Sequence, residues 1–532
     1  MSTTSVGAGA DSADDAGGVA GPPTGVRAVE GTDEPTGADT GGRPAAPSPR
    51  AVWAGRAVVL AGVALAVGTL LASGLGVLGA DLDTKWQVLD LRVLGDDPLR
   101  SLWYLHTQPP GYNLILGALA WSPLPLAGGW YALNVAALAG VGLLVHAMLV
   151  RWGVGPVAAG VVVAVALLDP SLLGALRFGH YEILVAFGIV AALASAQRYL
   201  DEPRPSWLLL SSATVTLCVL VRSLFHPAWA VAAIALLAAI RPAPRRYVAA
   251  AIALPLVLSG GWMLKNQLVF GELTTSSWLG FNLQRGVVAP MARDAVRADV
   301  ASGRVSSLAL EYPWGSIGQY DPWVGDCTTH DHPAVSLPEK QPYLGIRIAN
   351  FNHECFLPVY RQARADAVRL IREHPGRYLS TRADGLMMSY QVGDTGPAGD
   401  TWIDRVYRPA LLVTGVRLSQ DDWNLPLVGW DHVRLDVSLT LALLSGFVAG
   451  RGTVAAVRLA RTGWRTRRCW PTGEVMWVVV AATVAVVLVG GVLVEFGENG
   501  RFRSSLDPLL IALPLGWCTL AVRRWRAART DP

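Results

Sequence analysis

Two aspartates that could act as a catalytic base follow directly on the first long apolar stretch of the chain. Asp81 and Asp83 lie in the segment DLDTKW, where the chain should leave a membrane. A carboxylate there can take a proton from an attacking hydroxyl, and it can equally ligate a divalent cation. Because D-x-D pairs are common in loops, an ordinary surface loop is the alternative interpretation. The sequence leaves open which of the two aspartates is catalytic and whether a metal is needed.

A turn with the sequence HTQPPGY follows at residues 106–112. The two prolines fix an extended backbone, and Gly111 permits a sharp turn into the next helix. We expect this turn to hold His106, Gln108 and Tyr112 rigidly as one wall of a substrate cavity. The alternative is a purely structural turn.

Arginines at the ends of apolar segments form a second group of candidates. Arg501 and Arg503 lie in GRFRSSLDP, and Arg222 and His226 lie in VRSLFHP. Charges at membrane depth are costly and usually face a cavity or a partner, and a planar guanidinium suits bidentate binding of phosphate. We therefore favour a functional role for these four residues over snorkelling, with binding of a phosphate group as the chemistry that suits the arginines.

Other polar residues complete the candidate set. Glu182, Lys265 and Asn266 lie at the ends of spans and are expected in the cavity, although for Lys265 snorkelling to the membrane surface is an equal alternative. Cys327 and Cys355 lie in one soluble segment and could form a disulfide outside the cytoplasm. With the neighbouring histidines they match no standard zinc signature, so the metal content stays unknown.

The composition is that of a membrane protein. The 532 residues are 52% hydrophobic and 16% charged, with a mean hydropathy of +0.37, whereas soluble domains contain about 25% charged residues. A shorter run at 111–122 predicts a re-entrant or interfacial helix. Apolar runs near spanning length predict about ten transmembrane helices, at 57–80, 130–150, 154–170, 176–197, 207–222, 227–240, 247–265, 433–450, 475–496 and 506–522.

Loop arginines orient these spans. With the N-terminus in the cytoplasm, the Arg-rich connections lie inside, as the positive-inside rule requires, and the candidate residues lie outside. We thus expect an all-α polytopic protein of the cytoplasmic membrane with a mixed insert and with both termini cytoplasmic. Its parts would be a disordered tail at 1–50, a transmembrane module at 51–265 with an external catalytic loop at 81–129, an extracytoplasmic soluble insert at 266–432, transmembrane helices at 433–522 and a basic tail at 523–532.

The order of these motifs resembles the GT-C superfamily of polytopic glycosyltransferases, in particular the group with the protein O-mannosyltransferases and the aminoarabinose transferase of lipid A. The resemblance covers 57–285 and 433–522, and in place of the usual Arg before Asn this chain has Lys265. It rests on an acidic residue after the first span, an H-x-x-P-P-x-Y-like turn, a W-x-x-[RK]-N run and a late R-[FY]-R…P element, here Asp81 or Asp83, His106 to Tyr112, Trp262 to Asn266 with its continuation to Asn282, and Arg501 to Pro508.

The resemblance implies a GT-C-like fold and inverting transfer of a hexose or pentose from a polyprenyl-phosphate donor to an extracytoplasmic acceptor, which would be a cell-wall glycan, a lipid or a protein. An external carboxylate would activate the acceptor, while cationic residues would bind the donor phosphate and stabilise the leaving lipid phosphate. The candidates for this phosphate clamp are Arg501 and Arg503, with Arg222 and His226 as second choices. The expected partners are the donor and membrane lipids, not nucleic acid. No cofactor is assigned apart from an optional divalent cation, and the oligomeric state is open.

Two other functions remain as alternatives. A transporter or flippase of a lipid-linked sugar should show internal repeats, and we find no repeat relating the halves of the sequence. An inactive relative would serve as a binding or scaffold protein. The sequence also has no P-loop and no G-x-S-x-G elbow, which argues against a nucleotide-driven pump and a serine hydrolase of the usual fold.

Overall fold

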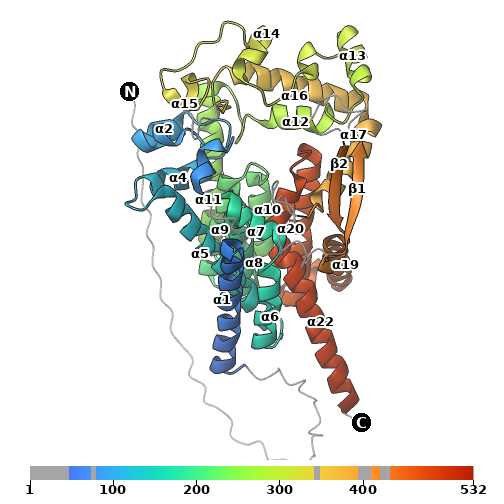
Figure 1. The fold of residues 1–532 in the computed structure, drawn as a ribbon. Coiled ribbons are helices and arrows are strands. Elements are labelled where there is room, and N and C mark those ends of the chain that lie inside the picture. The colour runs from blue at the N-terminus through green and yellow to red at the C-terminus, as the bar shows by residue number, and fades with distance from the viewer. Residues whose placement is uncertain (1–46, 73–78, 341–347, 393–408, 420–431, 531–532) are drawn as a thin grey trace, which may run out of the picture. The chain divides into compact units, whose positions relative to one another are not determined.

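The computed structural model describes residues 47–72, 79–340, 348–392, 409–419 and 432–530. The expected tail at 1–50 therefore lies outside the described residues up to position 46. The described part is helical, with one two-stranded sheet, and Figure 1 shows a bundle of long helices with an insert at one end. The expectation of an all-α membrane protein is confirmed at this level.

Six helices are long and apolar enough to cross a membrane. A seventh span would be a bent pair, α6 (Pro156–Leu167) with α7 (Pro170–Phe178), whose two parts meet at 60°. The expected runs at 207–222, 227–240 and 506–522 form α9 (Pro205–Val221), α10 (Pro227–Ile240) and α22 (Asp507–Thr530). The six are α1 (Pro49–Ala72), α5 (Leu126–Arg151), α8 (Glu182–Asp201), α11 (Arg245–Phe270), α19 (Leu439–Thr462) and α20 (Thr472–Val494).

Two expected boundaries were wrong. The span predicted at 433–450 begins with a strand, β2 (His432–Ser438), which pairs antiparallel with β1 (Val413–Ser419). The segment HVRLDVS alternates apolar and polar residues, the period of a strand rather than of a helix. Helix α19 begins at Leu439, where the Ser438 hydroxyl accepts a hydrogen bond from the Leu441 N–H. At the other boundary, α11 continues beyond residue 265 and ends before Gly271, whose φ of +72° suits glycine.

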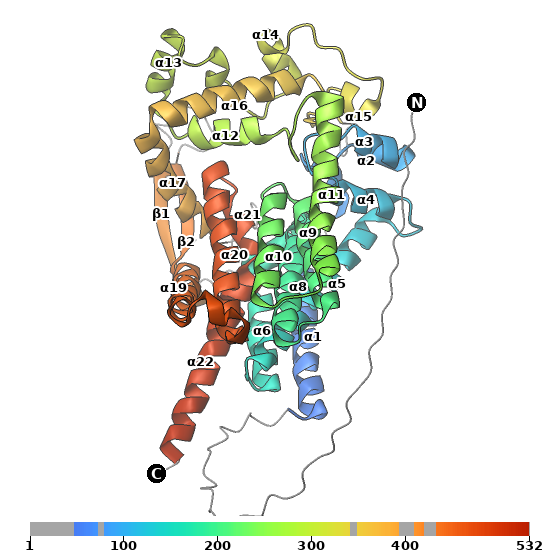
Figure 2. The same ribbon diagram turned by 180° about the vertical axis from the view of Figure 1, so that it is seen from behind.

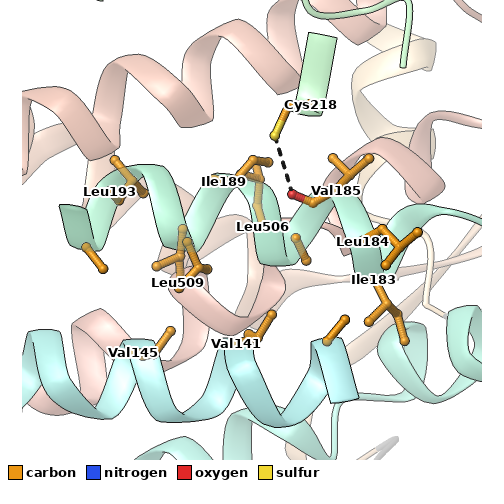
Figure 3. Packing of buried hydrophobic residues seen from close by; sticks show 14 of the residues in the cluster. Val141, Val145, Ile183, Leu184, Val185, Ile189, Leu193, Cys218, Leu506 and Leu509 are labelled. Atoms are coloured by element: carbon orange, nitrogen blue, oxygen red, sulfur yellow. Dashed lines mark hydrogen bonds between the residues drawn. The ribbon is translucent and has the colours of Figure 1, made fainter. Parts of the chain in front are cut away.

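Helix α8 is the centre of the bundle. In its most apolar 18-residue window 83% of the residues are buried, against 17% for α11, so α8 is surrounded by other helices. Ile183, Ile189 and Leu193 of α8 pack in one cluster with Val141 of α5 and Leu509 of α22 (Figure 3). This packing fixes the first turn of α8, which carries Glu182.

The segment expected as a loop at 81–129 contains short helices. They are η1 (Gly79–Thr84), α2 (Leu91–Asp96), α3 (Pro98–Trp103) and α4 (Gly111–Ala120). The carboxylates of Asp90 and Asp97 accept hydrogen bonds at the starts of α2 and α3, as N-cap residues do. Helix α4 has ten residues, too few to cross a bilayer, in agreement with the non-spanning helix expected there.

The insert has a core of its own, in which Trp278, Phe281, Trp314, Phe351 and Phe356 pack edge to face. Figure 2 shows α11 reaching from the bundle into the insert. Cys327 and Cys355 form a disulfide. The helices of the insert are α12 (Leu279–Val287), α13 (Arg293–Ala301), η2 (Ser307–Leu310), η3 (Ile317–Tyr320), α14 (Asp321–Val324), α15 (Pro333–Ser336), α16 (Phe356–Glu373) and α17 (Pro375–Ser389).

Candidate functional site

A cavity of about 380 Å³ lies at the ends of the bundle helices, because its lining residues follow α1, begin α8 and follow α20. Residues 84–87, directly after Asp83, form one wall. Helix α7, the start of α8 and the short helix α21 (Asn499–Ser504) form the others. With Gln391, segments from four distant parts of the sequence thus meet here, and three of them contribute charged or aromatic side chains.

Arg501 contacts three other side chains of the cavity wall. Its Nε and Nη2 atoms donate to Oε1 of Glu182 at 3.0 and 2.8 Å. Its Nη1 atom donates to Oε2 of Glu498 at 2.5 Å, and Nη2 lies 3.2 Å from Nδ1 of His180. All four side chains line the cavity. The guanidinium therefore has two carboxylate partners, one on each side.

Arg222 lies behind Glu182 rather than in the cavity wall. Its Nη1 atom is 3.6 Å from Oε1 of Glu182, and the two side chains are 6% and 2% exposed. The guanidinium carbon lies 3.9 Å from the centroid of the Phe502 ring. Within the described part of the chain, Nε of Arg222 and Oε2 of Glu182 have no hydrogen-bond partner. Arg222 thus contacts the cavity wall through Glu182.

The expected four-residue phosphate site is not formed. Arg503 is fully buried and does not line the cavity, because residues two apart on a helix do not share a face and α21 turns Arg501 inward instead. Its Nη2 atom donates to Oγ of Ser171 at 2.6 Å. His226 is exposed, and its Nδ1 atom accepts from the Ala228 N–H at the start of α10. Of these four residues, only Arg501 is among the residues that line the cavity.

Of the two expected catalytic aspartates, Asp83 directly precedes the cavity wall at residues 84–87 but does not itself line the cavity. The side chain of Asp81 lies outside the described residues. Asp83 is half-buried, and its Oδ1 atom accepts from the Leu91 N–H at 3.3 Å. Burial raises the pKa of the Asp83 carboxyl, and the Leu91 hydrogen bond partly opposes this. Nζ of Lys340 donates to the Asp83 carbonyl at 3.3 Å, and burial lowers the pKa of this lysine to about 7.

The HTQPPGY turn supports the cavity from behind rather than lining it. His106 is fully buried, with Nδ1 2.8 Å from Oγ of Ser277 and Nε2 3.0 Å from the Asn352 carbonyl. Burial lowers the pKa of His106 to about 3, and Lys265 adds to the effect. Gln108 and Tyr112 are buried too. These contacts dock the outer segment onto the insert, as the structural interpretation of this turn expects.

Lys265 and Asn266 also make structural contacts. Nζ of Lys265 donates to the Leu105 carbonyl at 2.5 Å and lies 3.7 Å from the centroid of the Trp262 ring. Nδ2 of Asn266 donates to the Thr274 carbonyl at 2.8 Å. Neither residue lines the cavity. Of the expected cavity residues, Glu182 is the one that the structure places in the cavity wall.

Sequence reasoning missed Glu498 and did not use Trp86. Glu498 precedes Arg501 by three residues, a helical pairing distance that could have revealed it. Burial alone would raise the pKa of Glu498, but Arg501 and Arg285 outweigh burial and hold this pKa below its usual value.

Trp86 stacks on Trp314 of the insert, with ring centroids 5.2 Å apart. It adds an aromatic face to the cavity wall.

The described residues contain no group of three or more His, Cys, Asp or Glu side chains arranged to hold a metal ion. Compared with protein families, curated proteins and solved structures, the chain shows no significant match. The resemblance to GT-C enzymes therefore rests on the sequence motifs alone.

Proposed function

We propose that this protein is a membrane glycosyltransferase that moves a sugar from a polyprenyl-phosphate donor to an extracytoplasmic acceptor. The observation that carries the proposal is Arg501. It lies in a cavity at the end of a membrane-helix bundle, between two carboxylates, with Trp86 on the wall. This reaction needs a cation to bind the phosphate, an aromatic face to contact the sugar and a carboxylate to remove the proton. The motif resemblance supports the donor class.

Donor binding would rearrange the pairs of Arg501. A phosphate that takes two N–H groups of Arg501 in bidentate fashion replaces Glu182. Arg222 can receive the released carboxylate, because its Nη1 atom is already 3.6 Å from Glu182 and its Nε atom has no hydrogen-bond partner among the described residues. The exchange keeps every buried charge paired, which buried charges require.

Acceptor activation needs an ionised carboxylate beside the bound sugar. In inverting transfer the base takes the proton from the acceptor hydroxyl, the oxygen attacks the anomeric carbon, and the bond to the phosphate oxygen breaks. Asp81 and Asp83 remain the candidates that the resemblance implies. Glu498 is a third candidate, because it lines the cavity and its lowered pKa keeps it ionised. Arg501 would then stabilise the charge that develops on the lipid phosphate.

A transporter of lipid-linked sugars is the second candidate, favoured by one observation. The bent pair α6 and α7 is a broken helix of the kind that forms binding sites in transporters, and α7 borders the cavity. A transporter would move the labelled donor across the membrane without transferring the sugar.

The experiment is a transfer assay in proteoliposomes with a radiolabelled polyprenyl-phosphate sugar and membrane acceptors. We expect label in the acceptor fraction and its loss in Arg501→Met, while Arg369→Gln, an exposed arginine of α16, keeps full activity. Among Asp81→Asn, Asp83→Asn and Glu498→Gln, the variant without activity identifies the base. Label that crosses the bilayer but stays on the lipid would reject the transferase and favour the transporter.

A further inference from the structure

Three charged side chains are sealed behind the cavity wall. The side chains of Arg503 and Asp507 have no exposed surface, and Nε of Arg503 lies 3.1 Å from Oδ1 of Asp507. Asp169, which precedes α7, is 2% exposed. Leu506 and Leu509, on either side of Asp507 in the sequence, pack towards α8 (Figure 3). Asp507 thus pairs with Arg503, and Asp169 lies near enough for the Arg503 charge to act on its carboxyl group.

The hydrogen bonds of these carboxyl groups are incomplete. Oδ2 of Asp169 accepts from the N–H groups of Ser171 and Leu172 at 2.9 and 3.2 Å. Its other oxygen and Oδ2 of Asp507 have no donor among the described residues, and Oδ1 of Asp507 has only the ion-pair contact with Arg503. The two carboxyl groups are nevertheless close enough for a hydrogen bond with each other. Two buried carboxylates in contact repel, whereas a proton between them supplies the missing donor and removes the excess charge.

We infer that Asp169 and Asp507 share one proton and form with Arg503 a neutral unit that positions the cavity wall. Arg503 joins the parts of that wall: its Nη2 atom donates to Ser171 of α7 and its Nη1 atom to the carbonyl of Gln391, which follows α17. Both partners line the cavity, as does Arg501, two residues before Arg503. The unit therefore fixes α21 against α7 and sets Arg501 opposite Glu182.

Infrared spectroscopy tests the shared proton without reference to any activity. The purified protein at neutral pH should show the C=O stretch of a protonated carboxylic acid that disappears in Asp169→Asn and in Asp507→Asn. Asp201→Asn, at the exposed pair with Arg151, should leave this band unchanged. Difference spectra that are identical for all three variants would overturn the inference.

Charge counting supplies a second test. Each single Asn variant leaves Arg503 one carboxylate, and its amide N–H takes the place of the shared proton. Both single variants should therefore fold. The double variant leaves Arg503 buried without a counter-charge, so its unfolding midpoint should fall far more than the two single shifts combined. Single variants that each lose as much as the double variant would overturn the inference.

The positioning role rests on the proposed function and has its own readout. In Arg503→Lys the charge remains, but an ammonium lacks the planar fork that reaches Ser171, Gln391 and Asp507 together. The donor KM should rise about tenfold, the equivalent of about one lost hydrogen bond to the bound phosphate, with a smaller change in kcat. A tenfold loss in kcat with an unchanged KM would contradict this role. If no transfer activity exists at all, only this arm fails, and the infrared result still decides the shared proton.

Discussion

Replacing Glu182 by glutamine should destabilise the protein strongly, because this carboxylate serves two buried cations. Glu182 and Arg222 are 2% and 6% exposed, and Arg501 is 17% exposed. Removing one partner of a buried ion pair costs about 3–5 kcal/mol, since it leaves an uncompensated charge. Arg501 keeps Glu498 as a partner, and the Gln oxygen can still accept its hydrogen bond. We therefore expect the lower end of the range, about 3 kcal/mol.

The free energy of unfolding can be measured by SDS titration in mixed micelles. The matched control is Asp201→Asn, which breaks the pair of Arg151 and Asp201, with side chains 24% and 30% exposed. A pair this accessible to solvent should contribute less than about 1 kcal/mol. The double variant Glu182→Gln with Arg222→Met removes both charges and should be more stable than Glu182→Gln alone. The reasoning is refuted if Glu182→Gln costs no more than the control, or if the double variant is less stable than the single one.

Three further predictions concern the disulfide, His106 and Trp86. Cys327→Ser with Cys355→Ser opens a link between residues 28 apart and should lower the free energy of unfolding by about 3–4 kcal/mol, measured by SDS titration; no change would show that the link does not constrain the insert. His106 has a folded pKa of about 3, below the value of about 6.5 for the unfolded chain, so its contribution to stability is complete above pH 6.5 and is lost as the pH falls towards 3. The free energy of unfolding of His106→Gln, measured against pH, should therefore fall less steeply below pH 6.5 than that of the unsubstituted protein, whereas that of exposed His226→Gln should fall as steeply. Equal slopes for the two variants would contradict the buried state of His106. Trp86→Ala should raise the donor KM about fivefold, because an aromatic contact contributes about 1 kcal/mol, and an unchanged KM would exclude Trp86 from the sugar site.

The apolar pattern predicted where the helices lie better than it predicted their lengths. Each expected run contains a helix, because a long apolar run favours the one element that satisfies its own backbone hydrogen bonds in a membrane. Six to seven of these helices are long and apolar enough to span on their own, where about ten spans were expected. The start of the run at 433–450 became strand β2, since its first residues alternate and pair with β1. The local apolar pattern thus predicts that a helix is present, whereas contacts with distant segments, such as the pairing of β2 with β1, decide where the helix begins.

The site was harder to predict than the fold, and Arg501 and Arg503 show why. They are chemically equivalent in the sequence, yet α21 directs one into the cavity and buries the other against Asp507. A helix of six residues is too short to be recognised from periodicity, so the sequence could not separate their roles. His106 is a second case. Its partners Ser277 and Asn352 lie 171 and 246 residues away, and no local motif reveals contacts at that range.

Glu182 shows what sequence reasoning can find. It was singled out as a charge at membrane depth, and the structure places it in the cavity wall beside Arg501. The rule behind this prediction is general: an intramembrane charge needs a partner or a cavity. Its partner could not be named in advance, because Arg501 lies 319 residues further along the chain.

The central claim is that a donor phosphate binds Arg501 in this cavity, and a structure with a non-transferable polyprenyl-phosphate sugar tests it most directly. We predict the phosphate within hydrogen-bonding distance of the Arg501 guanidinium, the sugar against Trp86, and Glu182 moved from Arg501 towards Arg222. A phosphate bound away from Arg501, or a cavity without lipid at saturating donor, would contradict the account.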